Sequence, residues 1–96
     1  MTKTVFSYTK ADGKVSSRSL IVLVETEHYL EGYDVSQLPN DEQNEVDESF
    51  NNVIEDYKAG ILTEKQYTED ILYLADVFDL KNNYRKFLTK NITNRS

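Results

Sequence analysis

The sequence has no cysteine, a single histidine (His28) and no long apolar run, and each absence excludes a class of protein. Without cysteine the chain has no disulfides, which are the usual support of a small secreted domain. One histidine and no cysteine exclude the usual ligand sets of zinc sites. No apolar stretch approaches the roughly 20 residues that span a bilayer, and residues 1–6 have no apolar leader. The sequence therefore predicts a cytoplasmic protein.

Catalytic groups are equally scarce. A nucleophilic enzyme needs a nucleophile beside a base, yet no serine or threonine lies in a recognisable motif, and His28 lies in a strand-like segment. Gly13, Gly32 and Gly60 are too far apart to build a phosphate loop. The acidic run at 41–48 lacks the glycine and the alternating ligands of a calcium loop. We therefore expect a binding protein without catalytic residues, metal or cofactor.

Charge is distributed unevenly along the chain. The formal net charge of −6 opposes general binding to nucleic acid. Eight acids between residues 34 and 56 are not interrupted by a base: Asp34, Asp41, Glu42, Glu45, Asp47, Glu48, Glu55 and Asp56. From Lys81 onward every charged residue is basic. A solvated acidic helix face explains the run most simply, and a surface for a basic partner is the alternative.

The first third of the chain is typical of β-structure. Residues 4–9 and 15–24 are rich in strand-forming residues, and Asp12-Gly13 between them is a strong hairpin signal. Residues 28–33 predict a third strand, in which Gly32 marks a bulge or a close backbone approach. We expect a three-stranded meander over residues 1–35.

The middle of the chain predicts a helical hairpin over residues 40–80. Apolar residues recur at helical spacing in two segments, first Val46, Phe50, Val53, Ile54 and Tyr57, then Tyr67, Ile71, Leu74, Ala75 and Phe78. Gly60 is a C-terminal stop, and Thr63 with Gln66 forms a capping box. So short a link favours two antiparallel helices.

The segment 84–88 fits a helix end or a final strand, and we predict a closing strand, followed by a frayed tail at 91–96. The expected fold is a single α+β domain with element order β-β-β-α-α-β. Its small, strongly bent antiparallel sheet carries an inserted helical hairpin.

Three segments resemble WYL domains, in the order of that family. Residues 6–20 are similar to its aromatic first strand, glycine turn and arginine-bearing second strand. Residues 28–34 resemble the strand that names the family, with His28 in place of the tryptophan. Residues 84–88 are similar to the closing strand, in which an arginine precedes an aromatic residue. The inserted helices and the missing helix-turn-helix depart from the family, and the chain looks most like short stand-alone WYL-like proteins of bacteriophages.

The resemblance implies an SH3-like or Sm-like small barrel that senses ligands or nucleic acid through a basic and aromatic patch. Carried over residue by residue, the patch would comprise Arg18, Tyr29 and Arg85.

Three functions follow as hypotheses. The favoured one is a phage-encoded accessory module that binds and modulates a host protein in the host cytoplasm. The second is a WYL-like sensor of a small anionic ligand or a short single-stranded nucleic acid at Arg18, Tyr29 and Arg85. The third is an acidic nucleic-acid mimic that contacts a basic enzyme through Glu45, Asp47 and Glu48. A protein is thus the favoured partner, nucleic acid is less favoured, and no membrane is expected.

Overall fold

The computed structural model describes residues 2–96, which form an α+β fold of one antiparallel sheet and a helical hairpin. The strands are β1 (Lys3–Thr9), β2 (Val15–Glu25), β3 (Tyr29–Asp34), β4 (Tyr84–Leu88) and β5 (Ile92–Thr93). The helices are α1 (Asn40–Lys58) and α2 (Glu64–Val77), with 3-10 turns η1 (Lys81–Asn83) and η2 (Thr89–Asn91). The strand order in the sheet is β4-β3-β2-β1-β5.

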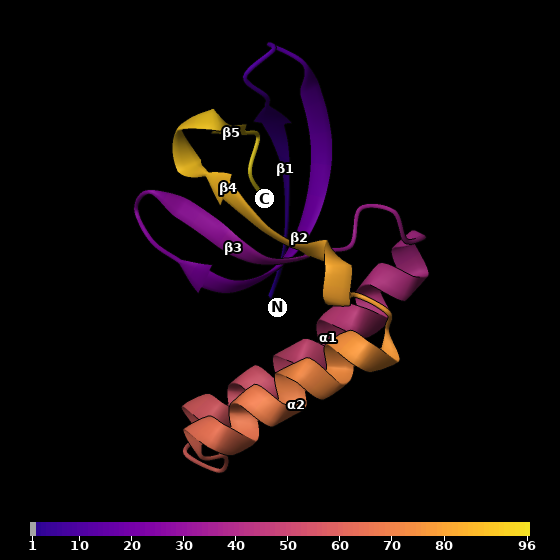
Figure 1. Cartoon of the computed structure of the whole chain (residues 1–96), viewed down its shortest axis with the longest axis vertical. Coiled ribbons are helices and arrows are strands. Elements are labelled where there is room, and N and C mark those ends of the chain that lie inside the picture. Colours follow the sequence, from indigo (N-terminus) through magenta and orange to yellow (C-terminus); the bar gives the residue numbers. More distant parts are fainter. Residues whose placement is uncertain (1) are drawn as a thin grey trace.

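The sheet is curled, because its two edge strands are consecutive in the chain. β4 and β5 lie at opposite edges, yet only the three residues of η2 connect them. The sheet therefore wraps around until these edges approach each other, as Figure 1 shows. Its inner face encloses a core of Phe6, Leu20, Leu30 and Phe87. Because side chains alternate along a strand, the neighbouring residues lie on the outer face.

Two glycine positions shape the first three strands. Gly13 has a φ of 85° in the turn between β1 and β2, where Lys10 and Lys14 are hydrogen-bonded across the hairpin end, so the predicted hairpin is confirmed. Gly32 pairs with Val22 beside a shift of register between Val22 and Val24. A Cβ on Gly32 would overlap the carbonyl group of Ile21. The predicted bulge and the predicted close approach are therefore both present at this site.

The helical hairpin begins and ends where local chemistry dictates. Gly60, with a φ of 79°, follows α1, and the Ile61 amide donates to the Asp56 carbonyl, which closes the last turn. The Thr63 hydroxyl accepts from the Gln66 amide, and the Gln66 side chain accepts from the Thr63 amide, so the predicted capping box is formed. Phe78, Asp79 and Leu80 end α2, and Asp79 has a φ of 57°.

A second core joins the hairpin to the outer face of the sheet. It comprises eight buried residues, namely Ile21, Tyr33, Val35, Val46, Phe50, Ile71, Ala75 and Leu80. The hairpin packs at one end of the sheet and extends away from it (Figure 1). The molecule is accordingly elongated, with principal extents of 43 × 29 × 22 Å.

The end of the chain differs in part from the prediction. Residues 84–88 form a strand, as predicted, which pairs with β3. The predicted order ends there, but the structure adds a fifth strand: Ile92 and Thr93 pair with Tyr8 and Ser7. Ser96 and Val5 then exchange two backbone hydrogen bonds of 2.9 and 3.1 Å. The segment 91–96 is thus paired with the first strand, where the sequence had predicted a frayed tail.

Candidate binding surface

The three residues of the predicted ligand patch are divided between the two faces of the sheet. Arg18 pairs with Phe6 and lies on the inner face, and Arg85 pairs with Gly32 on the same face as Phe87. Tyr29 pairs with Leu88, so it alternates with Leu30 and lies on the outer face. The structure therefore does not bring Arg18, Tyr29 and Arg85 into one site.

Arg18 is occupied by internal partners. Its guanidinium lies 3.1 Å from the carboxylate of Asp34, which is buried, and 5.9 Å from the centre of the Phe87 ring. The other Asp34 oxygen accepts from the amide and the hydroxyl of Ser36, and the Ser36 hydroxyl accepts from the Ser19 amide. This network satisfies a buried charge and fixes the end of β3 against β2.

Tyr29 and Arg85 also have local partners. The Lys86 ammonium lies 4.0 Å from the centre of the Tyr29 ring, a cation–π contact on the outer face. The Arg85 guanidinium donates to the carbonyls of Asn82 and Tyr84, so it closes the turn that enters β4.

The predicted acidic surface is divided in a similar way. Glu45 and Glu48 are exposed on α1, whereas Asp47 is only 1% exposed. Asp47 Oδ1 accepts from the amides of Thr2 and Lys3 and from the Thr2 hydroxyl, so the carboxylate anchors the start of β1. With Asp34 also buried, two of the eight acids in the run face the interior.

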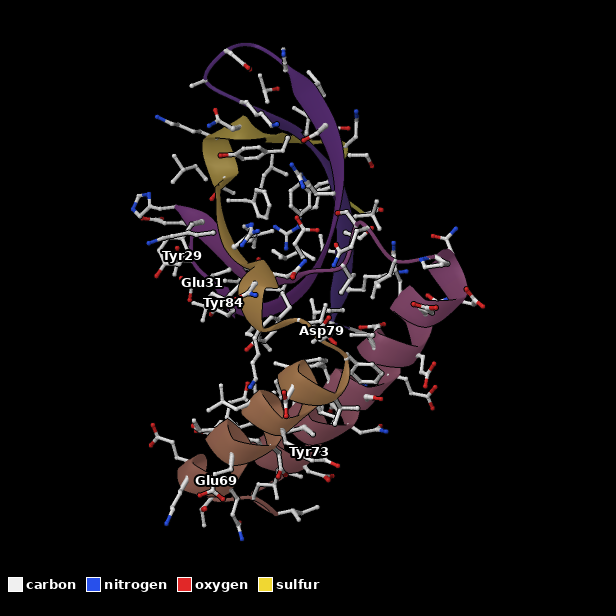
Figure 2. All side chains as sticks on the ribbon, turned by 45° about the vertical axis from the view of Figure 1, so that its right-hand side comes forward. Tyr29, Glu31, Glu69, Tyr73, Asp79 and Tyr84 are labelled. Carbon is white, nitrogen blue, oxygen red and sulfur yellow. The ribbon has the colours of Figure 1, made fainter. Side chains whose placement is uncertain are left out.

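Two clefts lie between α2 and the outer face of the sheet. One cleft, of about 560 Å³, is lined by Tyr33, Glu69, Leu72, Tyr73, Asp76 and Lys81. The adjoining cleft, of about 300 Å³, is lined by Leu23, Val24, Tyr33, Tyr67, Thr68, Ile71, Leu72 and Tyr84. Tyr33 and Leu72 line both clefts, so the two adjoin each other, and together we call them the α2 groove. Figure 2 shows Glu69 and Tyr73 on α2 and Tyr84 on the strand side.

Large apolar side chains are exposed along this groove. Leu72 is 58% and Tyr73 67% exposed on α2, and Tyr84 is 40% exposed across from them. Val77, at the end of α2, is 55% exposed but does not line either cleft. Isolated apolar residues on a surface are common, whereas adjacent ones are typical of surfaces that bind another molecule.

The strand side of the groove is aromatic and held in place. The Tyr84 ring meets the Tyr33 ring edge-to-face at 5.1 Å, and Tyr33 in turn packs on Phe50. The Tyr84 hydroxyl donates to Glu31 at 2.7 Å, and both residues lie together in Figure 2. Burial, reinforced by this hydrogen bond and the Glu31 charge, raises the pKa of Tyr84 above its usual value. Burial likewise raises the pKa of Tyr33.

Charges on the α2 side of the groove are mainly acidic. Asp76 pairs with Lys81 at 3.1 Å, and both side chains are about two-thirds exposed. Glu69 makes no salt bridge within residues 2–96. The groove thus combines an apolar floor with one unpaired carboxylate and one that is paired only at the surface.

The α2 groove was not identified from the sequence, although a signal for it exists. Leu72, Tyr73 and Val77 fall outside the apolar face defined by Ile71, Leu74 and Ala75. A helix with large apolar residues on two faces has a second surface to cover. That pattern could have indicated the groove before the structure did.

Neither a family model, nor a curated protein, nor a solved structure matches this chain. Within residues 2–96, no three histidine, cysteine or acidic side chains are grouped so that they could hold a metal ion. In the same part of the chain, neither helix is long and apolar enough to cross a membrane.

Proposed function

We propose that this chain is a non-catalytic protein-binding module that docks its partner in the α2 groove. The observation that supports the proposal is the pair of exposed apolar side chains on α2, Leu72 and Tyr73, which line a groove shared with the tyrosines of the strand side. Covering apolar surface drives most protein association, and buried aromatic and aliphatic anchors contribute most of the affinity. The polar side chains at the groove are two acids, a lysine, four tyrosines and Thr68, whose hydroxyl donates to the Glu64 carbonyl and so does not form a nucleophile–base pair.

The fold favours a rigid docking surface. The strand side is fixed by the Tyr33–Tyr84 ring contact and by the Glu31 hydrogen bond, and α2 is fixed by its capping box. A preorganised surface binds with a smaller entropy penalty than a flexible one.

The curled sheet also supports a finer proposal, namely a WYL-like barrel of the SH3 or Sm type. Its support is the resemblance of residues 6–20, 28–34 and 84–88, together with a five-stranded sheet whose two edge strands are joined by a three-residue turn. By the same resemblance to stand-alone phage proteins, the proposed partner is a host protein in the cytoplasm of an infected bacterium. In this proposal the barrel serves as a scaffold, because Arg18 and Arg85 are engaged within it.

The test is affinity capture from a bacterial lysate with three forms of the protein. Leu72→Ser removes an exposed anchor from the groove, and Val15→Ser removes an equally exposed apolar residue at the distant hairpin of β1 and β2. We expect a partner that binds the wild type and Val15→Ser but is lost with Leu72→Ser. A photo-crosslinking residue at position 73 should then attach to that partner, and one at position 15 should not. If no captured protein depends on Leu72 at any salt concentration, the proposal is wrong.

A further inference from the structure

One side of α2 offers a pattern suited to a second helix. Glu69, Leu72, Tyr73 and Asp76 all line the groove, and they follow one another at positions i, i+3, i+4 and i+7. Side chains at this spacing form a ridge that a helix can present to a neighbouring helix. We call these four residues the α2 ridge. Because a helix rises about 1.5 Å per residue, the ridge matches roughly two to three turns of a partner.

The ridge places acids at both ends and apolar residues between them. Leu72 and Tyr73 occupy the middle, while Glu69 and Asp76 flank them one turn away on either side. Such an arrangement fits a partner helix with an apolar stripe bordered by bases, since the flanks then form cross-helix ion pairs. The net charge of −6 attracts a basic segment from a distance as well.

A second copy of this chain is a poorer occupant. A two-fold interface would bring the same ridge against itself and so confront the two Glu69 and Asp76 carboxylates with their counterparts. Two chains of charge −6 also repel each other before they meet. Charge therefore distinguishes between the two occupants in favour of a foreign, basic helix.

We propose that the α2 groove binds a basic amphipathic α-helix, which lies along α2 and against the Tyr33–Tyr84 side of the sheet. This inference rests on the proposed function and specifies its partner. Lys81 acts in it as a competitor, because it holds Asp76 in a surface ion pair that an incoming base replaces.

The experiment uses three synthetic 16-residue peptides and the full chain labelled with ¹⁵N. The first peptide has leucines at i, i+3, i+4 and i+7 between lysines and arginines, the second is a scramble of it, and the third has glutamates in place of the bases. We expect the first peptide to shift the amide signals of residues 69–77 and 84 but not those of the hairpin at 12–15. We expect the scrambled and acidic peptides to bind at least tenfold more weakly.

Two charge variants with opposite expected effects test the role of the acids. Glu69→Gln should weaken binding of the first peptide about two- to fivefold, and Lys81→Met, which frees Asp76, should strengthen it by a similar factor. Glu45→Gln on α1 and Lys65→Met at the start of α2 remove the same charges outside the groove, and they control for the change in net charge.

Each outcome decides the inference separately from the proposed function. Equal binding of the scrambled peptide, or equal effects of Glu45→Gln and Glu69→Gln, would show general charge attraction and overturn it. If none of the peptides binds while capture of a lysate protein still depends on Leu72, the groove is a docking site for a partner of another kind, and only this inference fails.

Discussion

Single residues with unusual backbone geometry determine where the elements of this protein end. Asp79 has a φ of 57°, in the left-handed region, and the Leu80 amide donates to the Ala75 carbonyl across it. Glycine usually occupies this position after a helix, and α1 indeed ends in Gly60 with a φ of 79°. Both helices thus terminate with the same geometry, but α2 carries the steric strain of a side chain there.

Replacing Asp79 by glycine should therefore stabilise the protein. We expect Asp79→Gly to raise the free energy of unfolding by about 0.5–1 kcal/mol, and Gly60→Ala to lower it by about 1 kcal/mol. Nothing lies near a Cβ added at Gly60, so the second change tests backbone conformation alone. Chemical denaturation of both variants measures these differences. A destabilised Asp79→Gly variant would show that the aspartate side chain contributes more than its strain costs.

Gly32 is required for a different reason, namely space. Its φ is not positive, but a Cβ would overlap the backbone carbonyl of Ile21 in the neighbouring strand. Gly32→Ala should destabilise the protein by roughly 3 kcal/mol or more, because relief requires separating β2 from β3 beside the bulge. Gly13→Ala, which meets no neighbouring atom, is the matched control and should cost about 1 kcal/mol. The measurement is thermal unfolding followed by circular dichroism. Equal melting temperatures of the two variants would contradict this account.

At the scale of elements, the α2 groove brings three tyrosines with raised pKa values together. Burial is the main cause for Tyr33, Tyr67 and Tyr84, and the Glu31 hydrogen bond adds to it for Tyr84. A raised pKa means that the fold favours the protonated phenol. The associated stability is therefore fully present below pH 10, the usual tyrosine pKa, and is lost as the pH rises through the higher folded values.

Alkaline titration followed by tyrosinate absorbance tests this sign. We expect some of the seven tyrosines to ionise only at a higher pH than they do in the unfolded chain. The protein should lose structure over the same pH range. In Tyr84→Phe the late part should shrink, because the most strongly shifted group is removed. A titration that superimposes on that of the urea-unfolded protein would contradict the assignment.

The positions of strands, helices and turns could be predicted from this sequence far better than the face on which each side chain lies. The Asp12-Gly13 turn, the Gly60 stop and the Thr63 capping box are local signals, and all three formed as predicted. Whether Tyr29 shares a face with Arg18 depends instead on the register between β2 and β3, in which Leu20 pairs with Asp34, and no local pattern encodes that register. The predicted patch was divided for this reason. Asp47 was more accessible to prediction, since it precedes Phe50 by three residues and so lies on the apolar face of α1.

At the scale of the whole molecule, the two ends of the chain close the curled sheet together. β5 pairs with β1, Ser96 exchanges hydrogen bonds with Val5, and Arg95 pairs with Glu25 at 2.9 Å. Ile92 also packs against the inner core. These contacts join residues 70 to 91 positions apart. Local sequence patterns carry no signal for contacts at such separations, and the prediction of a frayed tail was wrong for this reason.

Deleting residues 92–96 should open this closure without abolishing the fold. The deletion removes an apolar side chain from the inner core and leaves the outer edge of β1 unpaired, so we expect a loss of about 1–3 kcal/mol in the free energy of unfolding. The α2 groove lies on the other core and should keep its affinity for the basic peptide. Hydrogen exchange provides a local measurement, because the Val5 amide donates to Ser96 and should exchange at least tenfold faster in the truncated protein. Unchanged exchange at Val5 would mean that the last residues do not hold the edge of the sheet in solution, and unchanged stability would contradict the contribution of Ile92 to the inner core.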